Sequence, residues 1–209
     1  MNLICNDCVG ARIYEQLGLQ FSNPFMWSLF AYDHFENLIR GYGKMNFTNI
    51  EVIFQKYRAS CENSFGIVID RSVKFFYIHH HEDKACVKPE KRGIDLYVND
   101  AATYLANSYM RRLARMSEQP IFMFHCETAG TEDEIKRFSE LITPYRKILL
   151  TNDMKHMRFR NANTSVAVID KTGTTGGAAK EFLTKYKTML QPGRLFINDG
   201  YSSWRTLWQ

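Results

Sequence analysis

The segment PIFMFHCETAGTEDEIKRFSELITPYRKILLT, at residues 120–151, decides the fold class of this chain. Its first apolar run, residues 121–124, has the composition of a buried strand, and a second apolar run at residues 147–150 predicts the next strand. Between them, Thr131 can begin a helix that continues to Leu141. A strand, a helix and a strand in this order are typical of a parallel sheet with helices on its faces.

The same alternation continues on both sides of this segment. Near the N-terminus, a strand, a tight turn and a helix are followed by Gly18, which suits the left-handed position after a helix. Towards the C-terminus, a β-branched strand leads through a Gly-rich turn into another helix. The strands of this kind are expected at residues 2–5, 165–169 and 194–197, and the helices at residues 11–17 and 178–190.

The middle of the chain departs from this alternation. Three extended segments are expected at residues 51–57, 66–69 and 73–79, with residues 70–72 as the hairpin turn between the last two. The sequence therefore predicts a single α/β domain over residues 1–209, with a mainly parallel sheet, helices on both faces and an antiparallel hairpin insertion. Two further helices are expected, one from Trp27 to Ile39 and one from Asn99 or Asp100 to Met116.

Composition and charge restrict the classes of function. The 209 residues are 45% hydrophobic and 23% charged, which excludes a disordered, collagen-like or disulfide-scaffold protein. No apolar run reaches the roughly 18 residues of a membrane span, and no secretory signal begins the chain, so we expect a cytoplasmic protein. The net charge of +5 is too small for a dedicated nucleic-acid binder but suits an anionic small molecule. The five cysteines are expected to be reduced.

Polar side chains follow each predicted strand. Because ligands of open α/β sheets bind at the carboxyl ends of the strands, these residues are the first candidates for a site, and we expect them to cluster at one end of the sheet. They are Asn6, Asp7 and Cys8 after the first strand, His79 and His81 after the hairpin, His125 after the next strand, and Asn152 after the strand at residues 147–150.

Cys8 and the histidines allow more than one chemistry. Cys8 lies beside a predicted helix N-terminus, whose dipole would lower its pKa, so it could be the nucleophile of an acyl transferase or hydrolase with His79, His81 or His125 as the base. Alternatively, Cys8 is structural and fills space beneath the helix. His79 and His81 share a strand face and could contact a metal or a substrate, or belong to an ordinary loop. We expect no metal site, and the sequence names no cofactor.

Two other features could hold an anion. Arg111, Arg112 and Arg115 lie in the predicted last turn of a helix, where guanidinium groups suit phosphate, although cations there also complement the helix dipole. We favour phosphate binding by Arg112 and Arg115, because one lysine would satisfy the dipole. The turn at residues 172–177, TGTTGG, offers backbone N–H groups to an anion or is simply flexible.

Three motifs resemble a bacterial domain family of unknown function whose members are often labelled exopolysaccharide-biosynthesis proteins. They are ICNDCVGARIYEQLGLQFSNPFMWSLF at residues 4–30, FYIHHHED at residues 76–83 and YMRRLARM at residues 109–116, and the segment at residues 120–151 continues the similarity. The resemblance covers about residues 2–152. The positions it marks are Asn6, Asp7, Cys8, Gly10, Gly18, Phe21, Pro24, Arg112, Arg115 and one histidine among residues 79–81.

The resemblance implies a cytosolic protein of surface or exopolysaccharide assembly. We expect a transferase-like enzyme acting on an activated sugar, with Arg112 and Arg115 on its phosphates and the turn from Asn6 to Gly10 in the same cleft. The alternatives are the Cys-dependent enzyme and a non-catalytic binding or scaffold protein of a biosynthetic complex. No pattern in the sequence specifies an oligomeric state.

Overall fold

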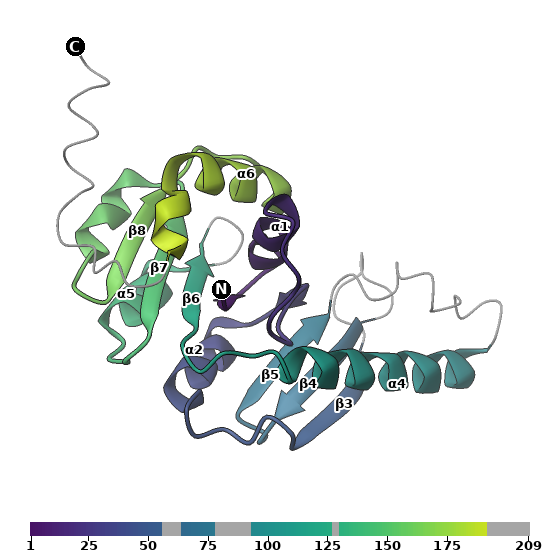
Figure 1. Cartoon of the computed structure of the whole chain (residues 1–209). Helices are drawn as coiled ribbons and strands as arrows, with labels where there is room; N and C mark the ends of the chain where they lie inside the picture. The colour runs from purple at the N-terminus through teal and green to yellow at the C-terminus, as the bar shows by residue number, and fades with distance from the viewer. Residues whose placement is uncertain (56–63, 78–92, 127–129, 192–209) are drawn as a thin grey trace, which may run out of the picture.

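The structure, a computed structural model, describes residues 1–55, 64–77, 93–126 and 130–191 (Figure 1). One of its two sheets is wholly parallel, with the strand order β1-β6-β7-β8. This order places the ends of β1 and β6 side by side, although about 120 residues separate them in sequence. The strands are β1 (Leu3–Cys5), β6 (Ile121–His125), β7 (Arg146–Thr151) and β8 (Thr164–Val168).

The second sheet is antiparallel, with the strand order β2-β5-β4-β3. Its strands are β2 (Ser28–Leu29), β3 (Ile50–Gln55), β4 (Ser64–Ile69) and β5 (Val73–Tyr77). The predicted hairpin turn is confirmed, because Asp70 and Arg71 both have positive φ and Ser72 N–H donates to the carbonyl of Ile69. The expected α/β class with a parallel sheet and an antiparallel insertion is therefore confirmed, and the insertion forms a sheet of its own.

Helices cover both faces of the parallel sheet. On one face, α1 (Val9–Gln16) and α6 (Thr175–Tyr186) share an apolar cluster with β1, β6, β7 and β8. On the other face, α2 (Tyr32–Gly41) and α5 (Glu132–Glu140) pack on alternate residues of the same strands. This second cluster also contains the buried face of the antiparallel sheet, along which α4 (Ile94–Leu113) lies (Figure 1). The two sheets thus share one core. Two short 3-10 helices, η2 (Met154–Phe159) and η3 (Lys187–Leu190), follow β7 and α6.

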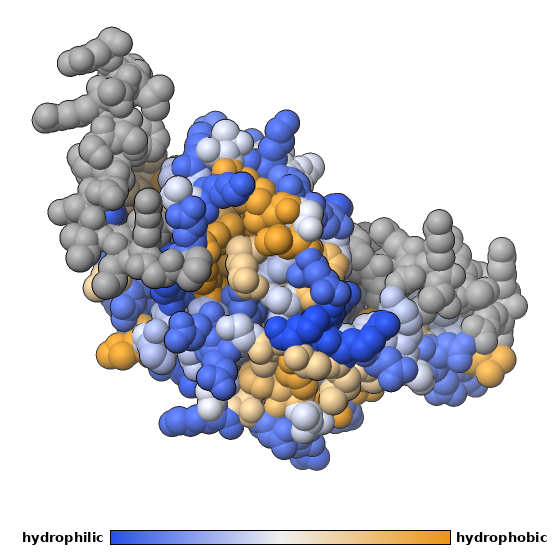
Figure 2. Space-filling view, viewed as in Figure 1, coloured by the Kyte–Doolittle hydropathy of each residue, from blue (hydrophilic) through white to orange (hydrophobic). Residues whose placement is uncertain are grey.

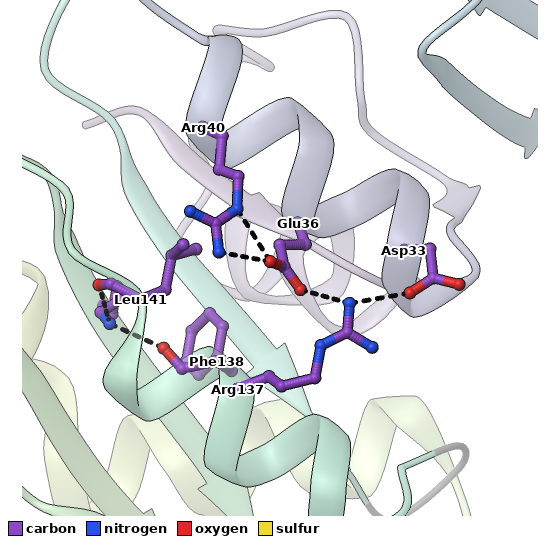
Figure 3. Close-up of polar contacts among 7 residues, drawn as sticks. Asp33, Glu36, Arg40, Arg137, Phe138 and Leu141 are labelled. Carbon is purple, nitrogen blue, oxygen red and sulfur yellow. Dashed lines mark hydrogen bonds and ion pairs between the residues drawn. The ribbon is translucent and has the colours of Figure 1, made fainter.

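Ion pairs between charged side chains link α2 to α5 (Figure 3). Arg137 of α5 donates to Asp33 at 2.9 Å and to Glu36 at 2.6 Å, both on α2. Arg40 also donates to Glu36, which is therefore shared by two guanidinium groups. Below them, the buried Nζ of Lys147 donates to the carbonyls of Phe138, Ser139 and Leu141 at the end of α5. Lys147 thus supplies donors to carbonyls that a helix end leaves unpaired.

Two predicted helix starts are wrong by five residues or more. Trp27 does not begin a helix: its φ is +60°, the next two residues form β2 on the antiparallel sheet, and α2 begins only at Tyr32. Neither Asn99 nor Asp100 is a cap, because α4 begins earlier, at Ile94 after Gly93, and contains both. The strand expected at residues 194–197 lies outside the described residues. No described helix is long and apolar enough to cross a membrane.

Candidate active site

Asn6 fastens the end of β1 to the end of β6. Its side-chain amide donates to the carbonyl of His125 at 3.2 Å, and its Oδ1 accepts from the backbone N–H of His125 at 2.7 Å. Its own carbonyl accepts from Phe30 N–H at 2.8 Å. Asn6 is buried, and these bonds engage both ends of its amide. The structure therefore gives Asn6 a role in positioning His125.

Asp7 and His125 form a buried pair at this edge of the sheet. The Oδ2 atom of Asp7 lies 2.6 Å from Nδ1 of His125, and the two residues are 4% and 1% exposed. The other carboxylate oxygen accepts from Val9 N–H at 2.9 Å and from the thiol of Cys5 at 3.3 Å. Asp7 thus joins the N-terminus of α1 to the end of β6.

This environment favours the ionised form of Asp7. Burial by itself raises the pKa of a carboxyl group, but the hydrogen bond and positive charge of His125, with the bonds from Val9 and Cys5, lower the pKa of Asp7 below its ordinary value. A carboxylate that accepts from Nδ1 fixes the orientation of the ring and stabilises its protonated form. The pair has the arrangement by which a carboxylate holds a histidine that acts as a general base.

Cys8 is buried directly beside this pair, at the start of α1. It is the N-cap residue of the helix, but its side chain makes no capping bond. Burial and the negative charge of Asp7 raise the pKa of Cys8 to about 12, against a smaller lowering by Arg12. The lowering expected from the helix N-terminus is therefore not found, because desolvation and a neighbouring carboxylate oppose it.

Gly10 lets α1 approach β1 closely. A Cβ atom at this position would lie 2.8 Å from the Cβ of Cys5, which is too short for a van der Waals contact. Any larger residue would push the helix away from the strand. Gly10 therefore keeps the turn from Asn6 to Cys8 tight, and with it the position of Asp7 against His125.

The two marked arginines lie in different surroundings. Arg112, in the last turn of α4, lies over the ring of Phe21 at 5.3 Å from its centroid, and one guanidinium nitrogen is 3.4 Å from the carbonyl of Met26. Arg115 lies beyond the end of α4 and is exposed. The sequence predicted that Arg112 and Arg115 bind phosphate together. In the structure, only Arg112 contacts the segment that precedes β2.

A second arginine reaches the same segment from α1. Arg12 lies over the ring of Trp27 at 4.7 Å, and the rings of Trp27 and Phe21 meet edge to face with their centroids 6.4 Å apart. Sequence reasoning missed Arg12 and Trp27, since the aromatic spacing was interpreted as helical. The positive φ of Trp27, which interrupts any helix at this position, could not be seen in that spacing.

The end of β7 contributes further polar groups to the same edge. Asn152, the next residue after β7, is exposed. Thr151, the last residue of the strand, is buried and its hydroxyl lies 2.7 Å from Nδ1 of His156 on η2. His156 was not among the predicted site residues, because only the 3-10 turn of η2 brings it back to the strand end.

Two of the predicted site residues have no described position. His79 and His81 fall outside the described residues. In the described part of the chain, no group of three or more His, Cys, Asp or Glu side chains could hold a metal ion. A cavity of about 600 Å³ lies at the opposite, amino edge of the parallel sheet, where Asn2, Tyr145 and Arg146 are among its lining residues. We place the candidate site at the carboxyl edge, because the paired acid and base groups are there.

Comparison with protein families gives a match over most of the chain. Residues 1–173 match the family model described as Domain of unknown function (DUF1919). The match extends beyond the region of about residues 2–152 in which the sequence motifs were found, and it includes all the strands described above. A comparison with curated proteins gives no match.

Proposed function

We propose that this chain, which belongs to the DUF1919 family, is a transferase of surface or exopolysaccharide assembly in the cytosol. Its donor would be a sugar activated by a phosphate or a nucleotide. The polysaccharide part of the proposal rests on the motif at residues 4–30, and the chemical part rests on the geometry at the carboxyl edge of the parallel sheet.

The observation that carries the proposal is the contact between Asp7 and His125. Sugar transfer to a hydroxyl group is assisted by a base that takes the hydroxyl proton, and a histidine oriented by a buried carboxylate is suited to that task. With Nδ1–H donating to Asp7, the neutral ring carries its lone pair on Nε2, the atom that would take a proton.

In the proposed step, an acceptor hydroxyl displaces the phosphate from the donor sugar. The acceptor hydroxyl transfers its proton to Nε2 of His125 as its oxygen forms a bond to the anomeric carbon of the donor. The bond from that carbon to the leaving phosphate oxygen breaks, and the phosphate leaves with the electron pair. Asp7 stabilises the imidazolium that forms. Arg112 would neutralise the departing phosphate.

The burial of His125 means that the proposed reaction requires a change of conformation. Its side chain is 1% exposed, so the carboxyl edge must open when donor and acceptor bind. Active sites that close over their substrates have the same requirement, and closure excludes the water that would otherwise hydrolyse an activated sugar.

The two alternatives differ in how they fit this geometry. A Cys-dependent enzyme would need a thiolate at Cys8, which a pKa of about 12 disfavours at neutral pH. A non-catalytic binding or scaffold protein would use the Asp7–His125 pair only to hold β1 against β6. In that case His125 would contribute to stability and to nothing else.

An experiment that measures both binding and turnover tests the proposed transferase against these alternatives. The wild-type chain is titrated calorimetrically with nucleoside diphosphate sugars and sugar 1-phosphates. Release of nucleoside diphosphate or of phosphate, respectively, in the presence of a mixture of acceptor glycans is followed by phosphorus NMR. We expect at least one donor to bind and to be turned over. We expect His125→Gln to keep donor binding and to lose turnover, because the glutamine can replace the hydrogen bond to Asp7 but cannot act as a base.

Three outcomes would contradict the proposal. One is that no activated sugar binds to the wild type. Another is that His125→Gln turns the donor over as fast as the wild type does. The third is that His125→Gln lowers the melting temperature while no turnover is found in either protein, which is the result expected of a scaffold.

A further inference from the structure

Two arginines from different helices converge on one aromatic pair at the surface. Arg12 of α1 lies over Trp27, Arg112 of α4 lies over Phe21, and the two rings touch edge to face. All four side chains are partly exposed. A guanidinium that stacks on a ring through its flat face still presents its N–H groups at its rim, which suits binding of a second group there.

The backbone at Trp27 holds this arrangement in an unfavourable conformation. Among the described residues, only three that are not glycine have positive φ, and two of these form the hairpin turn at residues 70 and 71. The third is Trp27, with a φ of +60° between buried Met26 and buried Ser28. Bulky residues rarely adopt this conformation, and strain of this kind gathers at ligand sites.

The donors of the two guanidinium groups are only partly used within the described residues. Arg12 has one ion pair, to Glu15 at 2.9 Å, with both side chains about two-fifths exposed. Such exposed pairs contribute little to stability and are easily exchanged for a ligand. The one hydrogen bond that Arg112 makes to a described residue, to the carbonyl of Met26, is long at 3.4 Å.

The surface near the end of α4, the helix that carries Arg112, combines charged and apolar areas. The face in Figure 2 has a strongly hydrophilic strip near the end of α4, with apolar surface on either side of it. The chain segment that contains Phe21 and Trp27 continues to Phe30, whose N–H donates to the carbonyl of Asn6 beside the Asp7–His125 pair. An anion held by the two arginines would therefore lie on the segment that leads to the candidate base.

We propose that Arg12 and Arg112, held by Trp27 and Phe21, form a diphosphate-binding site. The inference rests on the proposed function and narrows it: the donor is a sugar linked through a diphosphate, as in a nucleoside diphosphate sugar, rather than a sugar monophosphate. Each of the two phosphoryl groups of a diphosphate can offer a pair of outer oxygens to one guanidinium group, whereas a monophosphate has a single phosphoryl group to offer to both. Arg12, not Arg115, is the second arginine of the site.

The test uses inorganic pyrophosphate and inorganic phosphate as probes. Their dissociation constants are measured calorimetrically for the wild type, Arg12→Gln and Arg112→Gln. The matched control is Arg111→Gln, which removes the same charge from the neighbouring position, where the guanidinium donates to Ser108 at 3.0 Å. Circular dichroism and melting temperature confirm that each variant folds.

We expect the wild type to bind pyrophosphate more tightly than phosphate. Arg12→Gln and Arg112→Gln should each weaken pyrophosphate binding about tenfold or more, the effect of losing one charged hydrogen-bond set. Arg111→Gln should weaken it by less than about threefold, because only long-range charge is lost. The fluorescence of Trp27, compared with a Trp27→Phe variant, should change as pyrophosphate binds.

The outcomes distinguish this site from the proposed function. Equal pyrophosphate binding by Arg12→Gln, Arg111→Gln and the wild type overturns the site, even if nucleoside diphosphate sugars bind and are turned over. Pyrophosphate binding that depends on Arg12 and Arg112 supports the site, and it does so even if no activated sugar is turned over, a result that would count against the proposed function alone. Absence of pyrophosphate binding to the wild type overturns the site.

Discussion

The carboxylate of Asp7 lies 2.6 Å from Nδ1 of His125, so a turn at the start of the chain holds a strand end that is 118 residues away. The contact depends on the parallel pairing of β1 with β6, which places the residues after both strands at one edge. It also depends on Asn6, which binds both backbone groups of His125. The acid and the base of the candidate site are thus positioned by the sheet itself.

Asp7→Asn should destabilise the fold in a pH-dependent way. The pKa of Asp7 is lowered in the folded state from an ordinary value of 3.8, so ionised Asp7 adds stability that is complete above that value and is lost as pH falls through the folded-state pKa. We expect the variant to lose about 2–4 kcal/mol of unfolding free energy at pH 7. The difference from the wild type should shrink below about pH 4.

Urea unfolding at a series of pH values measures this difference. Asp33→Asn is the control, because Asp33 is 78% exposed and pairs with Arg137 at the surface. Its loss should cost less than about 1 kcal/mol. A deficit for Asp7→Asn that stays constant down to the acid limit would show that the carboxylate charge does not stabilise the pair.

Gly10→Ala should also destabilise the fold. The added Cβ would lie 2.8 Å from the Cβ of Cys5, and neither atom can move without shifting a helix or a strand. We expect a loss of about 1–3 kcal/mol, as for other overpacked cores. Gly176→Ala is the control, since nothing lies within 4 Å of a Cβ at this position in α6.

The melting temperatures of the two alanine variants provide the comparison. Gly176→Ala should be neutral or stabilising by up to about 1 kcal/mol, because alanine has the better helix propensity. Equal melting temperatures for Gly10→Ala and Gly176→Ala would mean that α1 does not approach β1 as closely as the structure shows.

Cys8 should react slowly with thiol reagents in the folded protein. It is 4% exposed and its pKa is raised to about 12 by burial and by Asp7, so little thiolate is present at neutral pH. Labelling with iodoacetamide, located by peptide mass spectrometry, should modify the partly exposed Cys126 before Cys8, and Cys8 only on unfolding. Fast labelling of Cys8 at neutral pH would restore the Cys-dependent enzyme as the better account.

Lys147→Met should destabilise the end of α5. The Lys147 side chain is 1% exposed and donates to three carbonyls, which methionine would leave without these donors. We expect a loss of about 2–4 kcal/mol. Lys136→Met, on the exposed side of the same helix, should stay within about 0.5 kcal/mol of the wild type.

The stability difference between the wild type and Lys147→Met should also depend on pH. Burial and the positive charge of Arg40 lower the pKa of Lys147 from 10.5 to about 8. Between these values the unfolded chain binds more protons than the folded chain, so the stability that Lys147 adds rises with pH. Chemical unfolding should therefore show the deficit of Lys147→Met growing from pH 8 to pH 10.5. A deficit that falls over this range would contradict the lowered pKa.

The parts of the fold that the sequence predicted are those determined locally. The apolar runs of β6, β7 and β8 and the helix start at Thr131 were recognisable, because a buried strand and a helix start depend on adjacent residues. The hairpin at residues 70–72 is of the same kind. The start of α2 was not predictable from spacing, since pairing of Ser28 and Leu29 with β5 overrides the helical period of the aromatic residues.

The candidate site was predicted only as a set of residues. Asp7 and His125 were both identified as residues that follow strands, but their contact depends on the strand order, which no local pattern contains. Arg12 and Trp27 were missed for the same reason, because α1 and the segment before β2 meet only in the folded chain. Polar residues at strand ends therefore indicate where a site lies, and the order of the strands decides which of them touch.

The most direct test of the account is a crystal structure of the chain soaked with nucleoside diphosphate sugars. We predict bound donor at the carboxyl edge of the parallel sheet, with its diphosphate against Arg12 and Arg112 and its sugar directed towards His125. Donor bound only in the cavity at the amino edge, beside Asn2 and Arg146, would contradict the account.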